Sequence, residues 1–67
     1  MKFKQGKIYT HERMLDCVIL VNKVHYQNEE RAMLRVRWAT RSGRDLNVNE
    51  NIEIAKSEFL NWYEWKN

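Results

Sequence analysis

Apolar and polar side chains alternate most regularly over residues 32–38. A period of two is the spacing of a half-buried β-strand, because successive side chains point to opposite faces of a sheet. The pattern places Ala32, Leu34, Val36 and Trp38 on one face and Met33, Arg35 and Arg37 on the other. We therefore predict a strand whose first face is buried and whose second face meets water.

Residues 16–26 predict a strand of a different kind. Residues 17–21 are apolar at every position, after which Val24 and Tyr26 alternate with Lys23 and His25. The β-branched side chains in this segment favour a strand over a helix. A strand that begins buried on both faces and ends with one face in water suits a bent strand shared by two parts of a small barrel.

The connection at residues 41–43 determines how the alternating strand pairs with the segment that follows. A two-residue loop at positions 42–43 would place Trp38 opposite Asn47. A three-residue loop keeps Trp38 opposite an apolar residue and puts Gly43 where a type I turn with a G1 bulge requires positive φ. We expect the three-residue loop, which opposes Thr40 with Arg44, Trp38 with Leu46, Val36 with Val48, Arg37 with Asn47, and Arg31 with Glu53.

Shorter elements complete the predicted order. We expect a strand at residues 7–10, an irregular connection at residues 11–15 and a polar hairpin tip at residues 27–30. The Asn-rich stretch 47–51 weakens the next strand, which recovers at residues 52–54. For the tail we expect a helical turn at about residues 57–61, capped by Ser57, and then an aromatic closing strand. A helix over residues 57–65 is the alternative, because Phe59 and Trp62 follow helical spacing.

The length of 67 residues indicates a single small domain spanning residues 1–67. A domain of this size buries only about 60% of the surface that its unfolded chain exposes, so it needs a well-packed core or an oligomer. With Cys17 as its one cysteine, the chain can form neither an intramolecular disulfide nor a Cys-x-x-Cys metal site. No apolar run is long enough for a signal peptide or a membrane span, and we expect a soluble cytoplasmic protein.

The order of these elements resembles the SH3-like small β-barrel. The features that match are Gly6-x-Ile8-Tyr9, the Ser42-Gly43 hairpin, and the run from Ile52-x-Ile54 through Lys56-Ser57-Glu58-Phe59 to Trp62-Tyr63. The resemblance covers most of the chain and is architectural. It implies a mainly β fold, a small five-stranded SH3-like barrel with a short helical turn or helix near the C-terminus.

The resemblance implies a binding module, since SH3-like barrels bind RNA, DNA or protein, and the fold alone does not select among these ligands. The acidic and aromatic signature of SH3 domains that bind proline-rich peptides is missing from residues 11–16. Isolated barrels of this size also resemble products of phage or other mobile genomes, a resemblance that rests on size and fold.

Charge is divided unevenly along the chain. Residues 1–44 hold ten Lys and Arg against four Asp and Glu, a net +6, and residues 45–67 hold two against five, a net −3. Arg35, Arg37, Arg41 and Arg44 form the candidate site for nucleic acid or an acidic partner, because guanidinium groups suit phosphate contacts. The alternative is an ordinary wet sheet face whose arginines pair across the strands.

The aromatic tail supplies the second candidate site. Trp62, Tyr63 and Trp65 form a tentative interaction surface, because so small a barrel cannot bury every aromatic ring. Trp62 and Trp65 lie on opposite faces of a strand, so at least one of them is expected to be exposed. Packing or dimerisation is favoured over base stacking here, since the surrounding acidic residues repel phosphate.

No catalytic constellation can be argued from the sequence. His11, His25 and Cys17 lack metal-ligand spacing, and there is no nucleophile–histidine–acid order or Gly-rich phosphate loop. We therefore expect a non-catalytic binding module without cofactor, metal or small-molecule substrate. A protein partner or homo-oligomer is favoured because an ordinary alternating strand already accounts for half of the arginines, and a nucleic-acid-binding barrel is the alternative.

Overall fold

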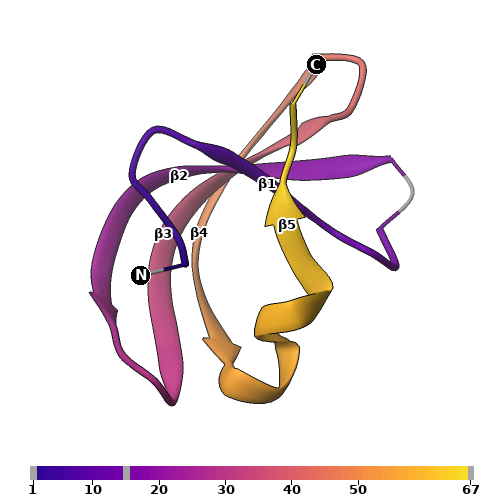
Figure 1. The fold of residues 1–67 in the computed structure, drawn as a ribbon. Helices are drawn as coiled ribbons and strands as arrows, with labels where there is room; N and C mark the ends of the chain where they lie inside the picture. The colour runs from indigo at the N-terminus through magenta and orange to yellow at the C-terminus, as the bar shows by residue number, and fades with distance from the viewer. Residues whose placement is uncertain (1, 15, 67) are drawn as a thin grey trace.

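A computed structural model describes residues 2–14 and 16–66, and within them the chain is mainly β. The elements in chain order are β1 (Ile8–His11), β2 (Cys17–Gln27), β3 (Arg31–Thr40), β4 (Asp45–Ala55), the 3-10 helix η1 (Lys56–Asn61) and β5 (Trp62–Glu64). The strands form one antiparallel sheet in the order β4-β3-β2-β1-β5. The sheet is strongly curved, and β1 and β5 cross over the layer formed by β2, β3 and β4 (Figure 1). The predicted five-stranded, mainly β domain with a helical turn before its last strand is confirmed.

The core fills the inside of this curved sheet. Its buried members are Phe3, Tyr9, Ile19, Val21, Ala32, Leu34, Val36, Ile54 and Trp62. The alternation predicted for β3 is confirmed, because Ala32, Leu34 and Val36 are fully buried and the intervening side chains are not.

Phe3 is a core residue that was not predicted from the sequence, because it lies in a basic N-terminal segment. Its ring makes edge-to-face contacts with Tyr9, Phe59 and Trp62 at centroid distances of 5.0, 6.0 and 6.5 Å. The Phe3 N–H donates to Gln27 Oε1 at 2.8 Å, and Gln27 Nε2 donates to the Phe3 carbonyl at 2.9 Å. This reciprocal pair fastens the N-terminal segment to the end of β2.

The turn between β3 and β4 has the predicted chemistry. The Thr40 N–H donates to the Arg44 carbonyl at 2.8 Å, the Gly43 N–H donates to the Thr40 carbonyl at 3.0 Å, and Gly43 has φ +97°. Glycine adopts this left-handed conformation without the steric cost of a side chain. The three-residue loop is therefore confirmed.

The pairing beyond the turn differs from the prediction by two residues. Ala39 pairs with Asp45, but Trp38 then pairs with Val48, so two extra residues of β4 lie between these pairs. Asn47 has φ +55°, and its N–H donates to Asp45 Oδ1 at 2.7 Å. This bulge accounts for the shift in register. Because the shift is two residues, each side chain of β4 stays on the face of the sheet that was predicted for it. The observed pairs are Trp38–Val48, Val36–Glu50, Arg37–Asn49 and Arg31–Ala55.

Several element boundaries also need correction. His11 belongs to β1 and not to the irregular connection, and β4 continues through the Asn-rich stretch that was expected to weaken it. The alternative helix over residues 57–65 is wrong, because η1 ends at Asn61 and β5 follows. Ser57 does not cap the helix: the N-cap is Ala55, and no side chain donates or accepts a capping bond there. No helix of the described residues combines the length and apolar character that a membrane crossing requires.

Candidate interaction surfaces

Arg37 projects from the outer face of β3 and is paired within the chain. Its Nη2 lies 2.7 Å from Asp45 Oδ2, and its Nε lies 3.1 Å from Asp45 Oδ1. Hydrogen bonding to the Arg37 guanidinium, then to the Asn47 N–H, holds the pKa of the Asp45 carboxyl below its usual range. The pKa of Arg37 is raised by the same contact with Asp45. The two charges cancel locally, so Arg37 contributes little to a positive field.

Arg41 has a structural role at the tip of the same hairpin. Its Nη2 donates to the Met14 carbonyl at 2.7 Å and to the hydroxyl of the fully buried Thr10 at 3.1 Å. Its guanidinium carbon lies 5.0 Å from the centroid of the Trp65 ring, a cation–π distance. These neutral partners fix the side chain across the outer face of the sheet and leave its positive charge uncancelled.

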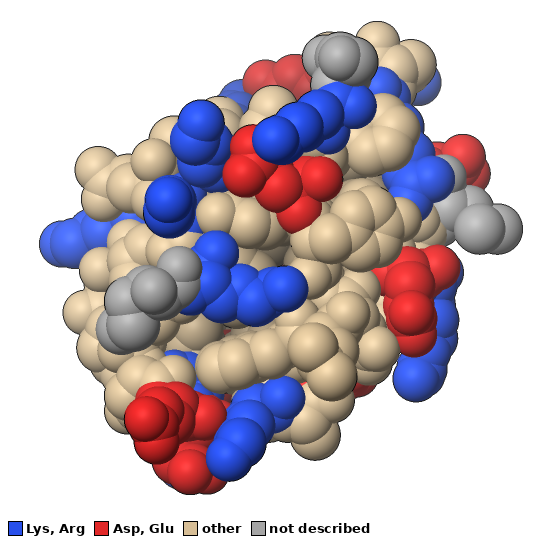
Figure 2. All heavy atoms as spheres, viewed as in Figure 1, with Lys and Arg blue, Asp and Glu red and all other residues tan. Residues whose placement is uncertain are grey.

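Arg35 and Arg44 complete the predicted basic set, and the structure gives them different surroundings. Arg35 is half-buried opposite Lys23 of β2, whereas Arg44 is exposed beside the turn. Among residues 2–14 and 16–66, neither forms an ion pair. On the face shown in Figure 2, basic and acidic side chains are interspersed in small groups without a continuous basic field. Arg37 and Arg41 line one depression, and Arg44 directly follows its lining residue Gly43. Of the four arginines, Arg37 is the one that forms an ion pair with the described residues.

The aromatic tail divides into three environments. Trp62 is 8% exposed and packs in the core, with its ring 5.2 Å from His11 in an edge-to-face contact. Tyr63 is 45% exposed, and Trp65 is half-buried beneath Arg41. Of the three predicted contact residues, Tyr63 is therefore the one that the fold leaves most open.

Leu60 is an exposed apolar side chain that the sequence interpretation overlooked. It is 93% exposed on η1, although the neighbouring Phe59 packs against the core. Helical spacing places Phe59 and Trp62 on one face and Leu60 on another. This spacing was the sequence signal that could have predicted the exposure of Leu60.

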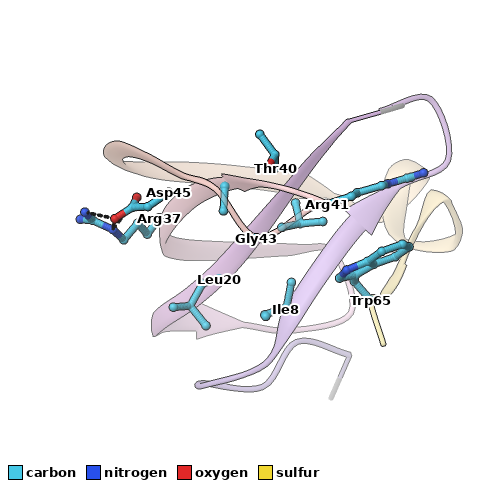
Figure 3. Close-up of a pocket in the computed structure, with 10 residues that line it drawn as sticks. Ile8, Leu20, Arg37, Thr40, Arg41, Gly43, Asp45 and Trp65 are labelled. Atoms are coloured by element: carbon cyan, nitrogen blue, oxygen red, sulfur yellow. Dashed lines mark hydrogen bonds and ion pairs between the residues drawn. The ribbon is translucent and has the colours of Figure 1, made fainter. Parts of the chain in front are cut away.

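An apolar groove lies on the outer face of the sheet, which we call the outer groove. Its floor is formed by Ile8, Val18, Leu20 and Ala39, and its volume is about 290 Å³. The Arg37–Asp45 pair lies at one end and Arg41 with Trp65 at the other (Figure 3). The sequence could not reveal this groove, because its walls come from β1, β2, β3, the β3–β4 turn and the tail.

A second depression, which we call the open-side hollow, lies where the edge strands β4 and β5 do not pair. Its volume is about 430 Å³. The lining residues are His11, Trp38, Ile52, Glu53, Ile54, Ala55, Glu58 and Trp62. Aromatic and aliphatic walls with carboxylates beside them suit a side chain with an apolar stem and a cationic end.

Two carboxylates are held mainly by neutral groups: Glu58, which lines the open-side hollow, and Glu50, which bonds the lining residue Trp38. Trp38 Nε1 donates to Glu50 Oε1 at 2.6 Å, and the Asn61 side-chain amide donates to Glu58. This amide contact, followed by a weaker contact with His11, holds the pKa of the Glu58 carboxyl below its usual range. Neutral donors fix a carboxylate in place and leave its negative charge available to a partner.

His11 contacts Glu58 through Nε2 at 3.5 Å, and its Nδ1 accepts the Arg13 N–H at 3.1 Å. This pair of contacts fits the neutral tautomer that carries its proton on Nε2. Glu53 differs from Glu50 and Glu58 because it lies 3.4 Å from the Arg31 guanidinium.

Metal-ligand chemistry is not assembled in the part of the chain that the structure describes, where no three His, Cys, Asp or Glu side chains gather. Cys17 is a free, half-buried thiol. Comparison with protein families, curated proteins and solved structures gave no match. The surfaces are therefore interpreted from their own chemistry.

Proposed function

We propose that this chain is a non-catalytic protein-interaction module with an SH3-like barrel fold, and that it binds a basic, extended partner segment at the open side of its sheet. The fold proposal is supported by the antiparallel strand order β4-β3-β2-β1-β5 and by the single helical turn before β5. The site is the open-side hollow together with the free edge of β4.

The observation that carries this proposal is the pairing of an apolar hollow with fixed, uncancelled carboxylates. Glu58 lines the hollow, beside walls that include Trp62, and is held by the neutral Asn61 amide. Glu50 lies next to the lining, where the Trp38 indole N–H holds it. A lysine or arginine side chain places its carbon stem on such walls and its charge against the carboxylates.

The edge of β4 supports an extended partner. β4 is eleven residues long and has β3 on one side, so its other side offers backbone groups without a neighbouring strand among residues 2–14 and 16–66. A partner segment that adds to this edge presents alternate side chains toward the hollow. Acidic residues on β4 also favour a basic strand over a second copy of β4, since like charges repel across a sheet.

The test uses two labelled decapeptides, one alternating lysine with valine and one alternating glutamate with valine. We expect the lysine peptide to bind, with an affinity that falls as salt is raised, and the glutamate peptide not to bind. The double variant Glu50→Gln, Glu58→Gln should weaken binding about tenfold, measured by fluorescence anisotropy.

The matched control is Asp16→Asn, Glu64→Gln, which removes the same charge at exposed residues that do not line the hollow and should leave the affinity unchanged. Equal binding of both peptides, or equal effects of the two double variants, contradicts the proposal.

Nucleic-acid binding is the second candidate function, and one observation favours it. Lys23 and Arg35 lie directly opposite each other on the outer face, although like charges in this position are destabilising. Such a pair suits a phosphate group that bridges the two strands. Binding of a labelled single-stranded oligonucleotide, lost at high salt and in Lys23→Glu, Arg35→Glu, would support this function, and no binding at low salt contradicts it.

A further inference from the structure

We propose that the protein associates with itself head to tail, with Leu60 of one copy seated in the outer groove of the next copy. This inference concerns Leu60 and the outer groove, which do not line the open-side hollow, and it goes beyond the proposed partner binding. Glu58 is the one acidic residue with a role at both places. It rests on an apolar projection, an apolar groove and opposite charges beside the two.

Leu60 supplies the projection. The side chain is 93% exposed on η1, and the fold holds it outward because the adjacent Phe59 ring packs 6.0 Å from Phe3. Its exposure therefore follows from the fixed direction of Phe59. Burial of a fully exposed leucine favours association, and this side chain has nearly all of its surface available.

The outer groove supplies the receptor. Its floor of Ile8, Val18, Leu20 and Ala39 is apolar, and its volume of about 290 Å³ accommodates a branched aliphatic side chain. Apolar surface in a concave site is removed from water when such a side chain enters.

The charges beside the two surfaces are complementary. Residues 57–64, which carry Leu60, contain Glu58 and Glu64 and no basic residue. Residues 37–44, beside the groove, contain Arg37, Arg41 and Arg44 and no acidic residue. Arg37 is neutralised by Asp45, but Arg41 has neutral partners and Arg44 forms no ion pair with the described residues. Two positive charges thus remain to attract an acidic surface.

The positions of the two surfaces make the contact heterologous. Figure 1 shows η1 at one end of the molecule and the turn between β3 and β4, which borders the outer groove, at the other. A copy therefore cannot fill its own groove with its own Leu60. Contact between two different patches repeats from copy to copy and gives chains that lengthen with concentration.

The experiment measures molecular mass by light scattering and sedimentation from about 10 μM to about 1 mM, the range in which weak association becomes visible. We expect the wild-type mass to rise with concentration beyond that of a dimer and to fall when salt is added. Leu60→Asp removes the projection, and Leu20→Lys blocks the groove. Each variant should weaken association at least about tenfold.

Mixing the variants distinguishes head-to-tail contact from other assemblies. The Leu60→Asp copy keeps its groove and the Leu20→Lys copy keeps its leucine, so an equimolar mixture should form one-to-one dimers and no longer chains. Ala39→Lys serves as a second groove variant if Leu20→Lys unfolds, as checked by circular dichroism. Tyr26→Asp is the matched control, because Tyr26 is an exposed apolar residue outside both surfaces.

A monomeric wild type at about 1 mM overturns the proposal, as does a mixture that stays monomeric or a wild type that stops at dimers. The peptide titration of the open-side hollow is performed at micromolar protein, where the chain is expected to be monomeric. Failure of self-association therefore leaves partner binding intact, and failure of peptide binding leaves self-association intact.

Discussion

Trp62 and Trp65 are three residues apart in the tail and fasten different layers of the molecule. Trp62 belongs to the inner cluster, where it packs with Phe3 and His11 under the curved sheet. Trp65 belongs to the outer layer, where it lies under Arg41 on the opposite face. The inner contacts join β5 and the N-terminal segment, whereas the outer contacts join the tip of the β3–β4 hairpin to the tail.

The two layers are stabilised by different kinds of interaction. The inner cluster combines apolar burial with edge-to-face aromatic contacts, which need no counter-charge. The outer layer depends on one cation that bonds Thr10 and the Met14 carbonyl, while its buried Nε has no hydrogen-bond partner among the described residues. The inner face therefore maintains the fold, while the outer face positions a charged hairpin beside a groove.

The largest loss of stability is expected at Trp62, and it should exceed the loss at Trp65. Trp62→Ala should destabilise the domain by about 3–5 kcal/mol, because it opens a cavity in the core. Trp65→Ala should cost about 1 kcal/mol, since it removes a partly exposed cation–π contact. Urea denaturation of both variants measures the difference, and Trp62→Phe provides a graded variant if Trp62→Ala does not fold. Equal losses of free energy would mean that the two layers do not differ in this way.

Arg41 is expected to have the next largest effect. Arg41→Lys keeps the charge but loses the planar group that reaches Thr10, the Met14 carbonyl and the Trp65 ring together. We expect a loss of about 1–2 kcal/mol in the free energy of unfolding. Arg44→Lys is the matched control at the same hairpin and should change stability by less than about 0.5 kcal/mol. Similar losses in the two variants would show that Arg41 does not hold the outer layer together.

Local signals predicted much of the fold. The alternation of apolar and polar residues in β3 indicates a strand with one buried face. Gly43 indicates a turn that needs positive φ. Both features depend on residues close together in the chain, and both are confirmed.

The register beyond the turn could not be predicted by the same means. The bulge depends on the left-handed conformation of Asn47 and on the hydrogen bond from its N–H to Asp45. Asparagine tolerates this conformation but does not require it, so its presence alone leaves the regular and the bulged strands open. A shift of two residues also keeps the same side chains on the buried face, so the hydrophobic pattern cannot distinguish the two registers.

The candidate surfaces were less predictable because they depend on contacts between distant segments. The basic alternation in β3 did not reveal that Arg37 pairs with Asp45 or that Arg41 reaches Thr10, which is 31 residues away. The outer groove likewise combines residues from separate strands and the tail. Composition correctly gave the charge division, but only the arrangement in space shows which charges are cancelled.

The smallest changes are expected in the dependence of stability on acid pH. The two carboxylates compared are Glu58, beside the inner cluster, and Asp45, on the outer face. Contacts with Asn61 and His11 lower the pKa of Glu58 below its ordinary value of 4.5, and Arg37 lowers the pKa of Asp45 below 3.8. A depressed pKa in the folded state contributes stability above the unfolded pKa, and this contribution is lost as pH falls through the folded pKa.

Glu58→Gln and Asp45→Asn should therefore each flatten the loss of stability as pH falls from neutral, and the variant and wild-type curves should converge below the folded pKa of the carboxyl that is removed. Because both carboxylates are solvent-accessible, the changes should be small and should shrink in high salt. Urea denaturation across this pH range measures both variants, with Glu29→Gln as an exposed control. An unchanged acid slope in Glu58→Gln alone would mean that the Asn61 and His11 contacts do not contribute to stability, and that acid acts on the outer layer first.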